Sequence, residues 1–163
     1  MMASGPQHEV SGDTLVDAVL SASRVLVAVA ARSLGDRAEE EVTLTQYRTL
    51  VVLASRGPQS LAALARAVDV TPPTATRMCD RLIRKGLIER RHERGDRRLI
   101  RLALAPKGQE LVSAVTERRR AEIARLLAAI PVEQQAALVD SLQRLTDAAG
   151  EVPEQDWSTG WDL

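Results

Sequence analysis

The sequence predicts a mainly α-helical protein with one small β-hairpin, and three features of the chain support this fold class. Apolar residues recur at helical spacing through most of the chain, and proline or glycine residues separate the helical stretches. Around Gly95-Asp96, a strand that starts at Leu87-Ile88 and an alternating return strand over residues 99–104 indicate a hairpin. With 163 residues, the chain is long enough for one domain with a real core, or for a domain with helical extensions.

The N-terminal part of the chain predicts a long apolar helix. Residues 1–12 are expected to be disordered, and a helix then runs to about Ser33. Asp13 or Thr14 can cap this helix, and Gly35 is placed to end it. Its middle is apolar on almost every side, which is typical of a helix that several neighbours bury. In a protein of this size, we expect a second subunit to supply part of that cover.

Two closely spaced helices follow. Thr43 or Thr45 can cap a helix that stops before Gly57-Pro58, and Ser60 starts a short third helix. Only a tight turn separates this short helix from the next one, which Thr71 can cap. A short helix, a tight turn and a second helix with a polar leading edge indicate a helix-turn-helix.

The helix after that turn has two distinct faces. Pro72 occupies its first position, where a missing N–H does no harm, and Gly86 ends it. At helical spacing, one face is apolar and is expected to pack: Ala75, Met78, Cys79, Leu82 and Ile83. The opposite face is polar and is expected to be exposed: Thr74, Arg77, Asp80, Arg81 and Arg84.

Two more helices are predicted towards the C-terminus. Pro106 opens a long helix to about Ile130, and Pro131 breaks it before a final helix that ends near Gly150. Their apolar stripes suit packing against each other or against a partner. The acidic C-terminal tail, residues 151–163, contains both tryptophans, and two alternatives remain open for it: docking, for example on the other subunit, or a loose tail.

The charges are unevenly distributed along the chain. The formal net charge is zero, yet residues 71–101 hold ten Lys/Arg against four Asp/Glu, which gives a local net charge of +6. Residues 1–45 carry −4 and residues 131–163 carry −6. A local basic patch of this kind is expected of a phosphate-binding surface. Nine of its ten cations are arginines, whose planar fork suits phosphates and guanine edges better than a point charge does.

The composition also excludes several classes of function. Tyr47, Trp157 and Trp161 are the only aromatic residues, so no stacking platform for single strands or RNA loops lies near the basic patch, and duplex DNA fits better. No Cys–His pair, phosphate-cradling glycine loop or metal cluster is present, so we predict no enzyme activity, no cofactor and no metal. A single cysteine, no evident signal peptide and no uncharged apolar run near the roughly 20 residues of a membrane span predict a cytoplasmic protein with no membrane partner.

The motifs resemble, in order, those of the MarR family of winged-helix transcriptional regulators, over nearly the whole chain. The matching segments are Leu44-Thr45-Gln46-Tyr47, Leu61-Ala62-Ala63-Leu64-Ala65, Thr76-Arg77-Met78-Cys79-Asp80-Arg81-Leu82, Lys85-Gly86-Leu87-Ile88-Glu89-Arg90, Gly95-Asp96-Arg97-Arg98 and Leu104-Ala105-Pro106-Lys107-Gly108. A helix-turn-helix alone would be a moderate signal. Asp-Arg-Arg at a wing tip, between flanking dimer helices in this order, makes the resemblance specific.

The resemblance implies a homodimer built from a single domain, residues 13–150. Its dimerisation helices, residues 13–35 and 106–150, would flank a winged helix DNA-binding lobe, residues 43–104. Each subunit would place one recognition helix in the major groove of double-stranded DNA and one wing in the adjoining minor groove, so the dimer would read a pseudo-palindromic operator. The resemblance also implies repression that a small-molecule effector relieves from a crevice between the dimer helices and the lobe.

Candidate DNA contacts follow from these placements. The leading turns of the recognition helix would contact base edges and phosphates through Thr74, Thr76, Arg77 and Arg81. Phosphates alone are assigned to Arg84, Lys85, Arg90, Arg91 and Arg94. Arg97 is the first choice for the minor groove, with Arg98 paired to Asp96 to brace the wing, although the two arginines could exchange these roles.

Three further residues are candidates for the effector crevice if the family geometry holds: Arg24, Tyr47 and Arg48. Tyr47 could equally be a core residue with its hydroxyl at the surface. Cys79 is expected to pack inertly in the core, and a redox-switched regulator acting through this thiol is one alternative function. The other alternative is a protein-interaction module on the same fold that binds no DNA and uses its acidic ends.

Overall fold

The computed structural model describes residues 11–35, 42–93 and 96–160, with the backbone alone at residues 93, 96–98 and 158–160. Its elements are α1 (Gly12–Gly35), α2 (Leu44–Arg56), α3 (Leu61–Ala67), α4 (Pro72–Arg84), β1 (Ile88–Glu93), β2 (Asp96–Leu104), α5 (Pro106–Leu127), α6 (Val132–Ala148) and the 3₁₀ helix η1 (Glu154–Gly160). The predicted fold class, mainly helical with one antiparallel hairpin, is confirmed. The predicted disorder of residues 1–12 falls almost wholly outside the described residues.

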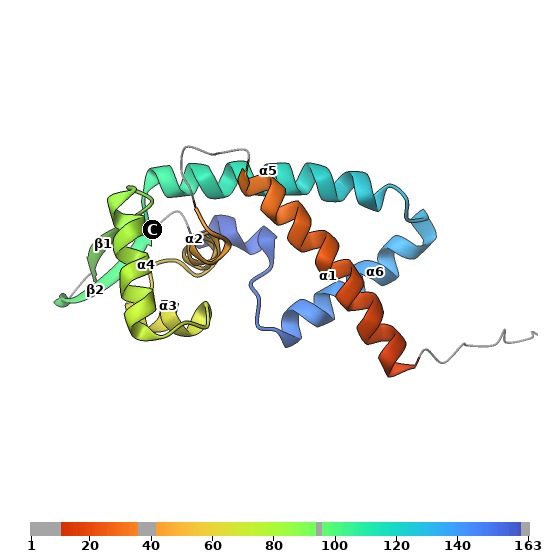
Figure 1. Cartoon of the computed structure of the whole chain (residues 1–163), viewed down its shortest axis with the longest axis horizontal. Helices are drawn as coiled ribbons and strands as arrows, with labels where there is room; N and C mark the ends of the chain where they lie inside the picture. Colours follow the sequence, from red (N-terminus) through yellow and green to blue (C-terminus); the bar gives the residue numbers. More distant parts are fainter. Residues whose placement is uncertain (1–10, 36–41, 94–95, 161–163) are drawn as a thin grey trace, which may run out of the picture.

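The helices divide the molecule into a lobe and a long extension. Figure 1 shows α2, α3, α4 and the hairpin grouped at one end, with α1, α5 and α6 extending away from them. α5 joins the two parts, because it contacts α2 and β2 in the lobe and α1 in the extension. α6 turns back from the far end of α5, and none of its residues is buried within the chain.

The centre of the lobe is α2, of whose 13 residues eight are buried. It contacts α3, α5, β2 and η1, so four different elements pack around one helix. The largest fully buried side chains of the lobe come from α2, α3, α4, α5 and the start of β1: Leu50, Leu64, Leu82, Leu87, Ile88 and Leu111. Because burying each such side chain contributes roughly 1.5–3 kcal/mol, α2 fixes where the other elements of the lobe lie.

The start of α2 resolves one open alternative. Thr43, rather than Thr45, caps the helix, since its Oγ1 accepts from the backbone N–H of Gln46 at 3.2 Å. The side chain of Gln46 in turn accepts from the backbone N–H of Thr43 at 3.1 Å, which completes a capping box.

The hairpin is buried at its base and exposed farther out. The sequence places Ile100, Leu102 and Leu104 on one side of β2 and Leu99, Arg101 and Ala103 on the other, and the regular register with β1 agrees. Burial does not follow these sides, because Leu102 and Ala103 are both buried whereas Leu99 and Ile100 are both exposed. Gln59 explains the buried base, because it exchanges two backbone hydrogen bonds with Leu102, at 2.9 and 2.7 Å. Burial therefore depends on distance from the lobe rather than on the face of the strand.

Candidate nucleic-acid interface

α4 presents one buried and one exposed face, as its sequence predicts. Ala75, Met78, Cys79 and Leu82 are buried, and Ile83 is half-buried on the same side. The exposed side chains are those assigned to DNA: Thr74, Thr76, Arg77, Arg81 and Arg84. The core therefore holds one face of this helix and leaves the cationic face towards solvent.

The turn between α3 and α4 sets how α4 leaves the lobe. Asp69 lies in the left-handed region, with φ of 52°, which asparagine and aspartate tolerate better than most residues. Next to it, the backbone N–H of Val70 donates to the carbonyl of Ala65 at 3.0 Å. A local left-handed residue thus produces the tight turn between the two helices.

The first turn of α4 differs from the prediction. Thr71 lies at the N-cap position but makes no capping hydrogen bond with its side chain; its hydroxyl instead lies 3.0 Å from that of Thr74. Pro73 at the second position has no N–H for the cap to accept from, and the Thr71 hydroxyl pairs with the hydroxyl of Thr74 instead of accepting from its backbone N–H. The hydroxyl of Thr76 donates to the carbonyl of Pro72 at 3.0 Å. In a DNA groove this hydroxyl can therefore act only as a hydrogen-bond acceptor, through its lone pairs.

Two cations of the basic surface have carboxylate partners. Arg90 of β1 donates to Asp80 of α4 at 2.9 Å, and Arg91 donates to Glu89 at 2.6 Å. All four side chains are roughly half exposed, and exposed pairs of this kind are worth about 0–1 kcal/mol, so a phosphate can compete for either arginine. The Asp80–Arg90 pair also connects the recognition helix to the wing, a positioning role that the sequence did not reveal.

The wing tip is described only in part. β1 and β2 pair in antiparallel register from Ile88 opposite Leu104 outwards, with an irregularity between His92 and Glu93. Arg94 lies outside the described residues, and of Asp96, Arg97 and Arg98 only the backbone is described. Their assignments to phosphate, brace and minor groove stay predictions. Lys85, at the end of α4, is half-buried and makes an interaction of its own.

The three candidate effector residues lie in different surroundings. Arg24 donates to Ser21 of its own helix at 3.0 Å, and Arg48 forms an ion pair with Glu151. Burial and the charge of Arg56 lower the pKa of Arg48. Tyr47 is 5% exposed and belongs to the core, as the alternative interpretation held, but its hydroxyl is buried and not at the surface as that interpretation expected.

A polar cluster under Tyr47 escaped the sequence analysis. The Tyr47 hydroxyl, Thr116 Oγ1 and Arg119 Nε are buried and have no hydrogen-bond partner among the described residues. Burial raises the pKa of Tyr47, while the neighbouring Thr116 and Arg119 lower it in part. Beside this cluster lies a cavity of about 280 Å³, lined by Thr116, Arg119, Arg120, Ile123, Ala124, Leu127 and Glu154. The i, i+3 spacing of Thr116 and Arg119 predicts that both lie on one face of α5, but only the fold shows that Tyr47 is next to that face.

The surroundings of Cys79 make its thiol unreactive. It is buried, and burial followed by the charge of Asp80 raises its pKa to about 11, against a smaller opposite effect of Arg90. Within the described part of the chain, no group of three or more His, Cys, Asp or Glu side chains could hold a metal ion. The effect of burial on the thiol is therefore larger than the opposing effect of Arg90, the cation that would favour the thiolate.

We expect Cys79 to resist a thiol reagent such as DTNB at pH 8 in the folded protein and to react promptly in denaturant. The folded state favours the protonated thiol, so this contribution to stability is complete below about pH 9 and is lost as the pH rises towards 11. Rates of labelling with and without urea provide the measurement. Rapid labelling of the native protein would instead support the redox-switch alternative.

Comparisons with known proteins agree with this arrangement. The pattern of the MarR family matches residues 42–100. The chain is 30% identical over 151 residues to the HTH-type transcriptional repressor MdtR of Bacillus subtilis (strain 168), covering 92% of this chain and 97% of that protein. It is also similar to the crystal structure of RV1404 from Mycobacterium tuberculosis, with 41% identity and a TM-score of 0.78, covering 90% of this chain and 99% of that one.

A more distant structure has the same fold. MepR of S. aureus, described with bound ethidium bromide, has a TM-score of 0.59 and 22% identity, covering 88% of this chain and 99% of that one. The similarity to MdtR extends across the lobe and the long helices alike, because it covers nearly all of both chains. From this match and from the helix-turn-helix with its hairpin, the chain belongs to the MarR family of transcriptional regulators.

Proposed function

We propose that the protein is a cytoplasmic, homodimeric repressor that binds double-stranded DNA at a pseudo-palindromic operator and is released by a small molecule. The observation that carries this proposal is α4, whose cationic face is exposed while its opposite face is fixed in the core. A rigidly held helix with arginines on its solvent side is what major-groove reading requires. The repressor MdtR among its relatives supports the sign of regulation.

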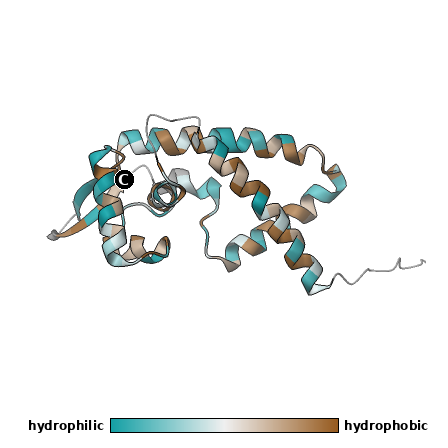
Figure 2. Ribbon diagram, viewed as in Figure 1, coloured by the Kyte–Doolittle hydropathy of each residue, from teal (hydrophilic) through white to brown (hydrophobic). Residues whose placement is uncertain are grey.

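Dimerisation is supported by apolar surface that this chain leaves uncovered. Large exposed apolar residues lie on α1, at the end of α5 and on α6: Leu15, Val16, Val19, Leu20, Val25, Leu26, Val27, Leu126, Leu127, Val132, Val139, Leu142 and Leu145. Figure 2 shows apolar residues along α1 and α6, and the large apolar side chains named above are exposed in the single chain. A patch of this extent marks an interface, and a second copy of the same helices is the partner that the family fold implies.

The apolar character of α1 has a second interpretation. Among the described helices, α1 is long and apolar enough to cross a membrane by length and composition alone. It nevertheless carries Arg24 within its apolar stretch, and Arg32 at its end pairs with Glu122 of α5. A charged residue in the middle of a membrane span is costly, and α1 already contacts α5, so a subunit interface accounts for this helix better.

The effector site that we propose is the cavity beside Tyr47, Thr116 and Arg119. Buried polar atoms without partners lose free energy, and a ligand that supplies those partners recovers it. The ethidium complex of MepR shows that a protein of this fold accepts a small organic molecule. Tyr47 does not line the cavity itself but interacts with Thr116 and Arg119, which do. Arg24 and Arg48, the other two candidates, neither line the cavity nor belong to this cluster, so they are assigned no part in it.

A gel-shift series with a salt titration tests DNA binding, using duplexes that the purified protein selects from a random-sequence pool. We expect Arg77→Ala to weaken operator binding by about 1–3 kcal/mol if it contacts a base, and to lower the salt slope by about one if it contacts a phosphate. Arg97→Ala should weaken binding without unfolding the protein. Arg125→Ala is the matched control, because this exposed arginine lies at the end of α5 away from the lobe.

The outcomes separate the competing functions. A protein that prefers no duplex over competitor DNA is not a sequence-specific repressor. If that protein captured one defined protein partner through its acidic ends, the protein-interaction alternative would replace the proposal.

A further inference from the structure

The chain continues past α6 and returns to the lobe. Gly150, with φ of 66°, reverses the direction of the backbone directly after α6, a conformation that glycine adopts without strain. Its carbonyl accepts from Arg56 Nη2 of α2 at 3.1 Å, so the reversal is held against the lobe. We call residues 150–157 the C-terminal strap.

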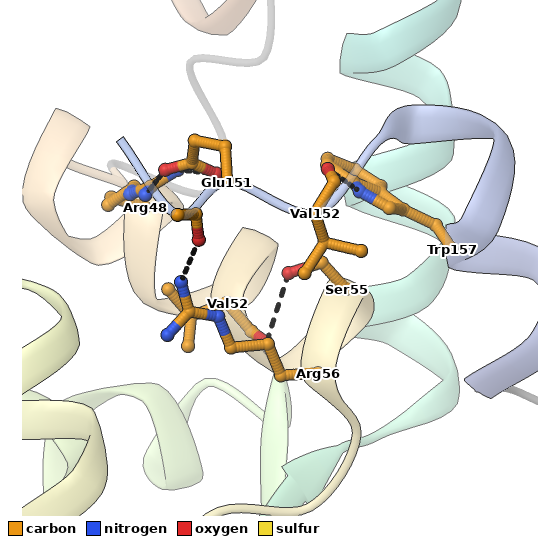
Figure 3. Close-up of polar contacts among 8 residues, drawn as sticks. Arg48, Val52, Ser55, Arg56, Glu151, Val152 and Trp157 are labelled. Atoms are coloured by element: carbon orange, nitrogen blue, oxygen red, sulfur yellow. Dashed lines mark hydrogen bonds and ion pairs between the residues drawn. The ribbon is translucent and has the colours of Figure 1, made fainter. Parts of the chain in front are cut away.

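The strap is anchored to α2 at several points (Figure 3). Glu151 forms an ion pair with Arg48, which lies about two helical turns before Arg56 on the same helix. Trp157 packs against the core cluster of the lobe and donates its indole N–H to the carbonyl of Val152 at 3.1 Å. η1, which contains Trp157, also contacts α2. The strap therefore docks on its own chain, which resolves the two alternatives left open for the part of the tail that is described.

The strap also reaches the cavity under Tyr47. Glu154 is one of the lining residues, opposite Thr116 and Arg119 of α5. The charge of Glu154 raises the pKa of Tyr47 and the charge of Arg119 lowers it, so residues from both walls of the cavity influence the hydroxyl. One short segment thus connects three features: the end of α6, the central helix of the lobe and the wall of the cavity.

This connection matters because α6 has little other attachment. None of its residues is buried in the chain, whereas α2 organises the whole lobe that carries α4. α5 links the extension to the lobe, Leu34 of α1 packs against the same core cluster, and the strap is a further link. The strap is the link that comes directly from the end of α6, so its attachment to α2 further restricts rotation of the lobe relative to α6.

We propose that the C-terminal strap is a latch that holds the lobe in its operator-binding orientation relative to α6, and that its release from α2 weakens operator binding. This inference rests on the proposed function, because it names how that DNA binding is regulated. A dimer reads two half-sites at a fixed spacing, so a freer lobe costs affinity for the operator. Non-specific binding, which depends on phosphate charge, does not require the same spacing.

Docking of the strap can be measured without DNA. The variant Trp161→Phe leaves Trp157 as the only tryptophan of the chain. We expect its fluorescence to be shielded from acrylamide in the full-length protein, and to become accessible when Glu151→Arg is added. A Trp157 that is as accessible as free tryptophan before any substitution would overturn the latch, whether or not the protein binds DNA.

The latch is then tested on an operator selected by the parent protein. Ending the chain after Gly150 should lower operator affinity about tenfold or more, within the usual range of coupling between sites. Arg48→Glu and Glu151→Arg should each lower it about two- to fivefold, as expected for an exposed pair, and the double exchange should restore it. Dimer mass by light scattering and non-specific DNA binding should not change in these variants.

Two results would contradict the proposal. The first is a truncated protein that binds the operator as tightly as the parent. The second is a double exchange that does not recover the affinity lost in the single exchanges, although circular dichroism shows that all variants are folded. If the parent protein selects no duplex, the proposed function fails, and the fluorescence measurement alone still reports whether the strap is docked.

Discussion

Replacing Gly108 by alanine should destabilise the lobe by at least about 3 kcal/mol, the upper part of the range for overpacking. A Cβ at this position would lie 2.0 Å from the carbonyl oxygen of Leu87 and 3.1 Å from Leu104 Cδ2. The nearest obstacle is backbone, which cannot turn aside as a side chain can. The start of α5 would have to move away from the wing, and the hydrogen bond from Ala105 N–H to the Leu87 carbonyl, 3.1 Å long, would be lost.

Urea denaturation followed by circular dichroism measures this loss. Gly12→Ala is the matched control, since a Cβ there meets nothing within 4 Å, and its stability should stay within about 1 kcal/mol of the parent. Equal urea midpoints for the Gly108→Ala variant and the parent would show that α5 can move without cost. The variant should also bind operator poorly, because α5 fixes the wing relative to the long helices.

The sequence pattern correctly predicted which side chains of a single helix are buried and which are exposed. The two faces of α4 follow from 3.6 residues per turn, so Met78, Cys79 and Leu82 were placed in the core correctly and Arg77 and Arg81 on the exposed face. Caps and breaks were predicted almost as well, because Pro106, Pro131 and Gly150 act on their own neighbours. The exceptions are Thr71, whose hydroxyl pairs with that of Thr74 instead of capping, and Asp13 and Thr14, which lie inside α1 because the helix already begins at Gly12.

Contacts between distant segments could not be predicted in the same way. No periodicity in the chain shows that Gly108 meets Leu87, that Gln59 adds a bridge to β2, or that Glu151 returns to α2. The Asp80–Arg90 pair and the cluster around Tyr47 likewise combine side chains from two elements. Each of these contacts depends on how helices pack, which is a property of the whole core rather than of a window of sequence.

The same reasoning makes α6 the most sensitive part of the extension. α6 has 17 residues and none of them is buried. This length is only slightly above the roughly 12–15 residues below which isolated helices are marginal in water, and most helical stability in proteins comes from packing of an apolar face. Its exposed leucines therefore have to be covered for the helix to persist. If a second copy covers them, the stability of α6 and the dimer are one property, and the melting temperature should rise with protein concentration.

The double substitution Leu142→Glu, Leu145→Glu should consequently convert the protein to monomers and weaken operator binding about 10²- to 10⁴-fold, the usual gain from linking two binding sites. Both leucines are about half exposed in the single chain, so the change costs little unless a partner buries them, whereas burying unpaired carboxylates in an interface is strongly unfavourable. Sedimentation velocity measures the mass, and a gel shift measures the affinity. Gln143→Glu adds the same kind of charge at a polar position of α6 and should leave both unchanged. A double variant that stays dimeric would place the interface elsewhere, and a monomer that keeps full operator affinity would show that two half-sites are not read together.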